Sequence, residues 1–175
     1  MIQIRKGVFE TNSSSSHSIV IMKKPYTTDN NETLPDWCLR NEGIVYFPSH
    51  DLSFGWSKDI LFNPYGRLRY AIASYSDDDD KIDEICELCR KNVKGFKGFR
   101  FNHAEYGDGI DRGYVDHLSY GLLQRMLNEC GVSLEEFIFN NRYIVIIDND
   151  NSDTIIDTMK DVGLLNMNRI EKIVE

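Results

Sequence analysis

Short apolar segments separated by polar residues predict β-strands in the first third of the chain. Apolar residues 19–22 follow a polar run, and together with the apolar residues before that run they predict a strand, a turn and a strand over residues 2–23. Residues 44–47 form the next candidate strand. Residues 26–42 are predicted to form a loop with one helical turn, in which Trp37 is the candidate for burial.

Apolar residues recur every three to four positions in the middle of the chain, which is the period of an α-helix. The first such segment spans residues 61–75, with Pro64 near its start, where a missing N–H costs nothing. The second opens with four aspartates at residues 77–80, whose charge suits the positive end of a helix dipole. Two further helices are predicted, over residues 118–130 and from the capping box at residues 133–136 onwards.

The end of the chain predicts a βαβ unit. Residues 143–147 are a strongly apolar strand candidate, an amphipathic segment follows and ends at Gly163, and residues 170–174 form a last strand. Residues 95–101 are a further, aromatic strand candidate. The pattern as a whole predicts one α+β domain over residues 1–175, with a mixed sheet of about five or six strands and three to five helices.

Composition adds a class and a compartment to this picture. The chain has 175 residues, of which 41% are hydrophobic and 27% charged, as is typical of a globular domain. No apolar run reaches the roughly 18 residues of a membrane span, and no signal region opens the chain, so we expect a cytoplasmic protein of the host cell, without a membrane partner and with reduced cysteines. Twenty basic and 28 acidic residues give a net charge of −8, which repels nucleic acid unless the bases gather in one place.

A serine-rich run near the N-terminus is the most unusual local feature. Ser15, Ser16 and His17 could supply a nucleophile and its base. The same hydroxyls and backbone N–H groups could instead hold a phosphate. A solvated hairpin loop, whose hydroxyls cap its own backbone, is the simpler alternative.

Histidines beside carboxylates are candidate ligands for a divalent metal. If such a site exists, we expect His103, Glu105, Asp116 and His117 to form it, because one loop connects them. Their spacing matches no standard metal motif, so ordinary surface residues are the alternative, and no other cofactor is predicted. Cys86 and Cys89 are interpreted as small core residues of a helix.

The only concentrated positive charge lies between residues 90 and 101. Its members are Arg90, Lys91, Lys94, Lys97 and Arg100. No acid interrupts this window, and the rest of the chain carries a net charge of −13. Because three phenylalanines interleave with the bases, the window is a candidate contact for nucleic acid or a partner, and Trp56 in another loop is a second candidate contact. Core phenylalanines flanked by solvated bases are the alternative.

Several segments resemble a family of small proteins found in phages and mobile elements of gut Firmicutes. The opening RKGVFETNSSSSHS at residues 5–18 is the specific part, and shorter likenesses lie at residues 54–56, 113–117 and 140–151. The chain is also similar, more weakly, to broad-range inhibitors of Cas9-type nucleases, the anti-CRISPR proteins. This resemblance implies a binding protein and transfers no role to any individual residue.

Three functions are compatible with these features. The first is a phage accessory protein that binds and inhibits a host nuclease such as Cas9, alone or together with nucleic acid, by presenting an acidic surface that mimics DNA. The second is an enzyme acting on a phosphate-containing or nucleotide substrate through Ser15, Ser16 and His17, or through the metal candidates. The third is a structural protein of a virion, against which the even spread of charge argues. We favour the first.

Overall fold

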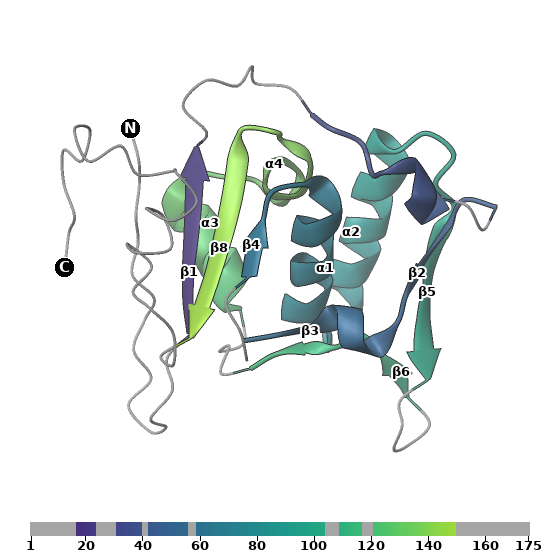
Figure 1. Cartoon of the computed structure of the whole chain (residues 1–175), viewed down its shortest axis with the longest axis horizontal. Coiled ribbons are helices and arrows are strands. Elements are labelled where there is room, and N and C mark those ends of the chain that lie inside the picture. The colour runs from purple at the N-terminus through teal and green to yellow at the C-terminus, as the bar shows by residue number, and fades with distance from the viewer. Residues whose placement is uncertain are drawn as a thin grey trace.

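Two helices lie between two small β-sheets in the computed structural model of the chain (Figure 1). The structure describes residues 17–23, 31–39, 42–55, 59–103, 109–116 and 121–149. The helices are α1 (Pro64–Ser74), α2 (Asp79–Asn92), α3 (Leu122–Cys130) and α4 (Leu134–Phe139), with short 3₁₀ turns η1 (Asp36–Leu39) and η2 (Ser49–Leu52). The strands are β1 (His17–Lys23), β2 (Ile44–Phe47), β3 (Ser53–Phe54), β4 (Asp59–Leu61), β5 (Gly98–His103), β6 (Ile110–Asp111), β7 (Tyr114–Val115) and β8 (Tyr143–Asn149).

The first sheet has the strand order β1-β8-β4, and both of its pairings are antiparallel. Central strand β8 is buried along Tyr143–Ile147, so both of its faces are covered. Tyr143, Val145 and Ile147 belong to the main hydrophobic core, which also contains Ile21 and Leu61 from the two neighbouring strands. Strand β1 therefore docks an early part of the chain onto β8, which lies more than 100 residues later.

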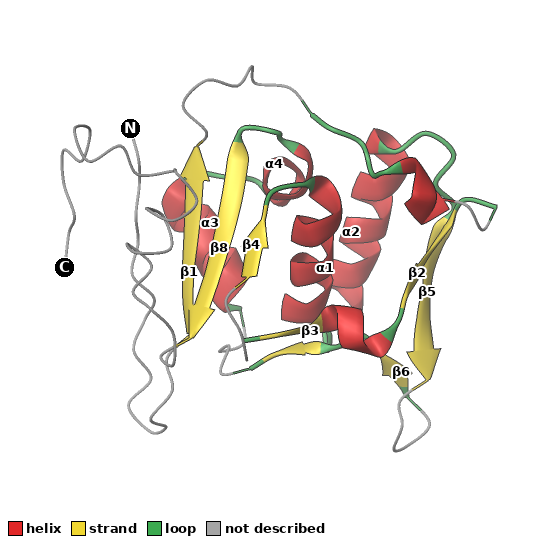
Figure 2. Cartoon of the chain, viewed as in Figure 1, coloured by secondary structure: helices red, strands yellow, loops and turns green. Residues whose placement is uncertain are grey.

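The second sheet lies on the other side of the helices, where β5 pairs in parallel with β2 and antiparallel with β6 (Figure 2). Val45 and Phe47 of β2 point into the core, while Tyr46 between them is 41% exposed. Phe47 stacks on Tyr65 of α1 and on Phe101 of β5, which fixes this sheet against the helices. A third, two-stranded sheet joins β3 to β7 in parallel.

Helix α1 is buried on nearly all sides because elements pack around it. Asn63 caps its N-terminus by accepting a hydrogen bond from Gly66 N at 2.9 Å, and Pro64 occupies the first turn as predicted. Leu68, Ala71 and Ile72 are fully buried, and so is Tyr70. A helix that is covered all round is a core helix, so α1 organises the domain.

The other helices begin and end at the capping residues that the sequence contains. Asp78 caps α2 through Lys81 N at 3.0 Å. The predicted capping box at α4 forms, since Ser133 and Glu136 bond reciprocally. Gly131 ends α3 with a left-handed φ of 63°.

The α+β class is confirmed, but the expected single sheet of five or six strands is wrong. The strands that the structure describes divide into three small sheets, and the helices separate the two larger ones. The prediction that Trp37 is buried is also wrong, because Cys38 takes the inward position of η1 and Trp37 stays 51% exposed, edge-on to Tyr65. The helix and last strand of the expected βαβ unit lie outside the described residues. In the part of the chain that is described, no helix is long and apolar enough to cross a membrane.

Candidate functional site

Most of the predicted catalytic residues lie outside the described part of the chain. Ser15 and Ser16 are not described, and of His17 only the backbone is, as the first residue of β1, where it pairs with Asn149. The serine–histidine hypothesis therefore stays a prediction. Trp56 likewise lies outside the described residues.

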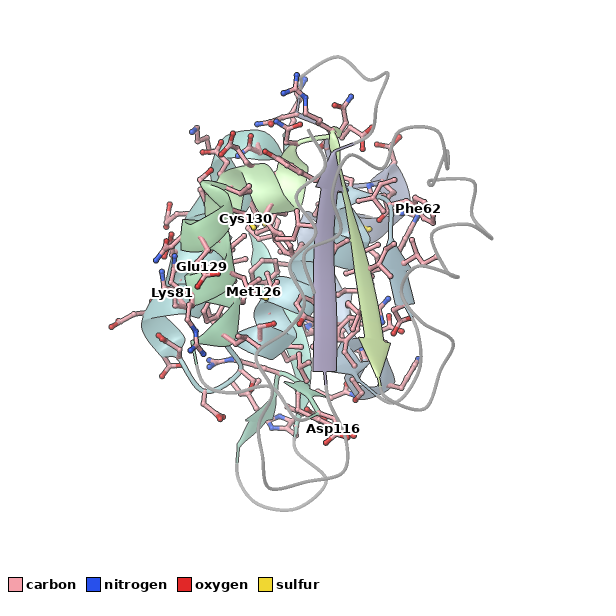
Figure 3. All side chains as sticks on the ribbon, turned by 90° about the vertical axis from the view of Figure 1, so that its left-hand side faces the viewer. Phe62, Lys81, Asp116, Met126, Glu129 and Cys130 are labelled. Atoms are coloured by element: carbon pink, nitrogen blue, oxygen red, sulfur yellow. The ribbon has the colours of Figure 1, made fainter. Side chains whose placement is uncertain are left out.

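Two of the four predicted metal ligands are described. His103 ends β5 and is exposed, and it pairs with Ile110 of β6. Asp116 follows β7, and its backbone N–H donates to Phe54 O at 2.9 Å. Figure 3 places Asp116 at the lower end of the molecule, well apart from Lys81 near the start of α2. Glu105 and His117 lie outside the described residues, and among those described no group of three or more ligating side chains could hold a metal ion.

The predicted basic window separates into two parts with different surroundings. Arg90 forms an ion pair with Glu87 one turn earlier in α2. Lys91 donates to Glu135 of α4 at 2.7 Å, and this contact together with one from Asn92 lowers the pKa of the Glu135 carboxyl. Both bases are thus paired within the protein. The Arg90 pair lies within α2, and the Lys91 pair connects α2 to α4.

The other three bases of the window are exposed and form no ion pair with any described residue. Lys94 and Lys97 flank the turn at Gly95 between α2 and β5, and Arg100 lies in the middle of β5. The backbone N–H of Lys97 donates to Gly43 O at 2.8 Å, which fixes this turn beside the start of β2. These three cations are the part of the window that is available to an anionic partner.

The phenylalanines of the window point into the protein. Phe96 is buried, and Phe99 and Phe101 pack against the core beside Phe47. The alternative interpretation, core phenylalanines flanked by solvated bases, therefore holds for these rings. The aromatic side chain that does lie on the surface next to Arg100 is Tyr46, which the sequence analysis did not single out.

An acidic face runs along α2. Asp80, Asp83, Glu84 and Glu87 are exposed and lie at positions i, i+3, i+4 and i+7, which share one side of a helix. Glu84 pairs with Lys81 at 2.7 Å and Glu87 with Arg90. Asp80 and Asp83 form no ion pair with a described residue.

The helix dipole explains only part of this acidity. Its favourable effect on carboxylates falls off within the first turn, so it accounts for Asp79 and Asp80 but not for the acids that follow. Asp79 is in addition held by Arg112 at 2.5 Å. Asp83 is left without a local stabilising role, and we therefore treat the exposed side of α2 as a candidate contact surface.

A second polar cluster surrounds Asp51 at the end of η2. Its carboxylate accepts a hydrogen bond from the Tyr65 hydroxyl at 3.3 Å and lies 3.4 Å from Nε2 of the exposed His50. Arg69 donates from Nε to the Asp51 backbone carbonyl at 2.5 Å, and its guanidinium lies over the rings of Phe54 and Tyr65. Burial, followed by the charge of Asp51, raises the pKa of Tyr65 to about 12, so its hydroxyl stays a donor at neutral pH. These contacts connect η2 and β3 to α1, so they support a structural role for the cluster.

The cysteines are placed as core residues rather than as a redox pair. Cys89 is fully buried and Cys86 is half-buried on α2, as predicted. Burial raises the pKa of both thiols, which is the opposite of the shift that a reactive cysteine needs.

Arg67 is a heavily hydrogen-bonded side chain that sequence reasoning missed. It is fully buried in α1 and donates to four backbone carbonyls. These are Ile138 O at 3.0 Å, Phe62 O at 3.1 Å, Tyr143 O at 2.8 Å and Asn140 O at 3.1 Å. Burial lowers its pKa to about 10, with Glu32 acting in the opposite direction, so it remains charged at neutral pH. The only signal in the sequence is its position, three residues after Pro64 and four before Ala71, which places it on a buried side of the helix.

Comparison with known proteins finds no match among protein-family models, curated proteins or solved structures. The function proposed below therefore depends on the chain's own residues and on the resemblance of its opening segment.

Proposed function

We propose that the chain is an accessory protein of a phage or mobile element that binds and inhibits a host defence nuclease such as Cas9. The acidic face of α2 is the observation that supports this proposal best. The resemblance of residues 5–18 to proteins of such elements, and the net charge of −8, point in the same direction. In this proposal the protein acts in the cytoplasm of the host cell.

The mean density of carboxylates along α2 is close to the charge density of one DNA strand. Four carboxylates between Asp80 and Glu87 span seven residues, or about 10.5 Å at 1.5 Å per residue. On average this is one carboxylate per about 3.5 Å of helix axis, and one strand of a DNA duplex carries one phosphate per about 3.4 Å of its axis. A basic channel shaped for DNA can therefore receive this face of α2 as a substitute for phosphates.

Not all four charges are equally available in the free protein. Lys81 and Arg90 screen Glu84 and Glu87, whereas Asp80 and Asp83 face no described base. Binding through this face is therefore expected to depend mainly on Asp80 and Asp83.

Retention by immobilised Cas9 tests the proposal, with and without guide RNA and across several orthologues. We expect the unsubstituted chain to be retained and Asp80→Lys/Asp83→Lys to be lost. Asp36→Lys, which reverses an exposed carboxylate in η1 outside α2, is the control and should be retained. No retention by any orthologue, or equal retention of the double variant, would contradict the proposal. Circular dichroism establishes that each variant is folded.

A further inference from the structure

No described helix or strand covers the outer face of the sheet that β2 and β5 form. Helices α1 and α2 cover its other side, and in Figure 1 no described element lies beyond the two strands. Tyr46 and Arg100 are direct partners in the parallel register, so their side chains are neighbours on this outer face. Both are exposed.

The ring of Tyr46 is held across this face by its own hydroxyl. The hydroxyl donates to Oδ1 of Asn102, which lies two residues beyond Arg100 on the adjacent strand. The ring therefore spans the boundary between β2 and β5 while remaining 41% exposed. A ring that is already fixed loses little conformational entropy when another flat group stacks on it.

Positive charge that forms no ion pair with a described residue adjoins the ring. Arg100 is its direct neighbour, and Lys97 and Lys94 precede β5. From Lys97 to Arg100 the chain advances about 10 Å, at roughly 3.3 Å per residue. The cations are therefore spread along the strand direction, as contacts to successive phosphates of one nucleic-acid strand require. Among the described residues, the acids on the adjoining segments are Glu42, in the turn before β2, and Asp111 of β6, whose carboxylate accepts from Gly113 N at 2.8 Å.

We propose that this outer face binds single-stranded nucleic acid, with a base stacked on Tyr46 and phosphates held by Lys94, Lys97 and Arg100. A flat aromatic ring beside unpaired cations is the arrangement by which proteins hold single strands without reading their sequence. The inference goes beyond the proposed function because α2 contributes none of these four residues. It also revises the sequence-based hypothesis: the stacking ring is Tyr46 instead of the phenylalanines, and Arg90 and Lys91 take no part.

Fluorescence anisotropy of the full chain with labelled oligonucleotides tests the inference. The probes are oligo(dT) and oligo(rU) of about 12 nucleotides, within the usual range of site sizes, and a duplex of equal length. We expect single strands to bind at low salt, with log K falling against log salt concentration with a slope of about −2 for three phosphate contacts. The two single-stranded probes show whether DNA or RNA is preferred.

Single substitutions distinguish the contribution of the Tyr46 ring to binding from that of the positive charges. Tyr46→Ala should weaken binding at least about fivefold, whereas Tyr46→Phe keeps the ring and should lose less than Tyr46→Ala. Arg100→Gln should make the slope shallower by about 0.7, and Glu42→Gln should tighten binding. Arg90→Gln is the matched control: it removes a base that is already paired with Glu87, and it should leave the slope unchanged.

Three results would overturn the inference. They are no binding of any single strand at low salt, equal binding by Tyr46→Ala and the unsubstituted chain, and a duplex that binds as tightly as the single strands. Thermal unfolding establishes that each variant is folded; the two Tyr46 variants lose the hydrogen bond to Asn102 and should unfold at a slightly lower temperature. Failure here leaves the nuclease proposal standing, since that proposal depends on Asp80 and Asp83.

Discussion

Replacing Arg67 with methionine should destabilise the protein more than any other single arginine substitution in the described part of the chain. Methionine has a similar length and fills the buried space, but it donates no hydrogen bond. The Arg67 guanidinium joins α1 to the backbone around residues 138–143, which leads from α4 into the central strand β8. Its removal therefore affects the core of the domain.

The carbonyls that lose their donor set the magnitude of the loss. Asn140 O also accepts a hydrogen bond from Tyr143 N at 3.2 Å, which is retained in the variant. Ile138 O, Phe62 O and Tyr143 O lose the Arg67 contacts at 2.8–3.1 Å. A hydrogen bond to a charged donor contributes about 1.5–3 kcal/mol, and the relief of a buried charge offsets part of the sum over the four bonds. We expect the free energy of unfolding to fall by about 3–5 kcal/mol, which is a large fraction of the usual value of about 5–15 kcal/mol for a folded protein.

Urea denaturation measures this loss as a shift of the midpoint at constant slope. Arg67→Lys keeps the charge but has one nitrogen in place of three, and it should lie between the unsubstituted chain and Arg67→Met. Arg125→Met, on the exposed side of α3, is the control and should change stability by less than about 0.5 kcal/mol. If Arg67→Met shifts the midpoint no further than Arg125→Met does, the four hydrogen bonds do not hold the fold together as described.

Three further predictions concern stability. Gly113→Ala should lower the melting temperature, because φ is 72° and the added Cβ would lie 2.1 Å from Leu52 O; an unchanged melting temperature contradicts this. Ser133→Ala should cost about 1 kcal/mol in urea denaturation, since it removes the acceptor for Glu136 N, and a shift near zero would show that the cap is dispensable. Burial raises the pKa of the Cys38 thiol from 9.0 to about 11, so the stability that its neutral form contributes is complete below pH 9 and is lost as the pH rises toward 11. The free energy of unfolding of Cys38→Ala should therefore fall less steeply with pH between 9 and 11 than that of the unsubstituted chain. Equal slopes would refute the assignment.

Local structure was predictable where neighbouring residues determine it. Strand β2 has the predicted bounds, and α1 lies within the predicted segment because Pro64 and the Asn63 cap define its start. The arrangement of the strands was not predictable in this way. β1 pairs with β8 across most of the chain, and nothing in a hydrophobic period indicates that helices will separate two sheets.

For the candidate surfaces, the sequence predicted which charged residues occur together but not which partners they contact. The basic window is visible in the sequence, but the partners that neutralise Arg90 and Lys91 depend on helical register and on the packing of α4 against α2. The position of Tyr46 does carry a signal, because it lies between two apolar residues of a short strand and alternation places it on the opposite face. Its neighbour Arg100 could not be identified, since the parallel register of β2 and β5 is a tertiary feature.

Inhibition of target-DNA cleavage tests most directly whether the acidic face of α2 takes the place of DNA. A guide-loaded Cas9 is mixed with the chain either before or after its target DNA, and the rate of cleavage is measured. We predict that the chain slows cleavage only when it is added first, that Asp80→Lys/Asp83→Lys has lost this effect, and that Asp36→Lys retains it. Uninhibited cleavage in every order of addition, or inhibition by the double variant equal to that of the unsubstituted chain, would contradict the account.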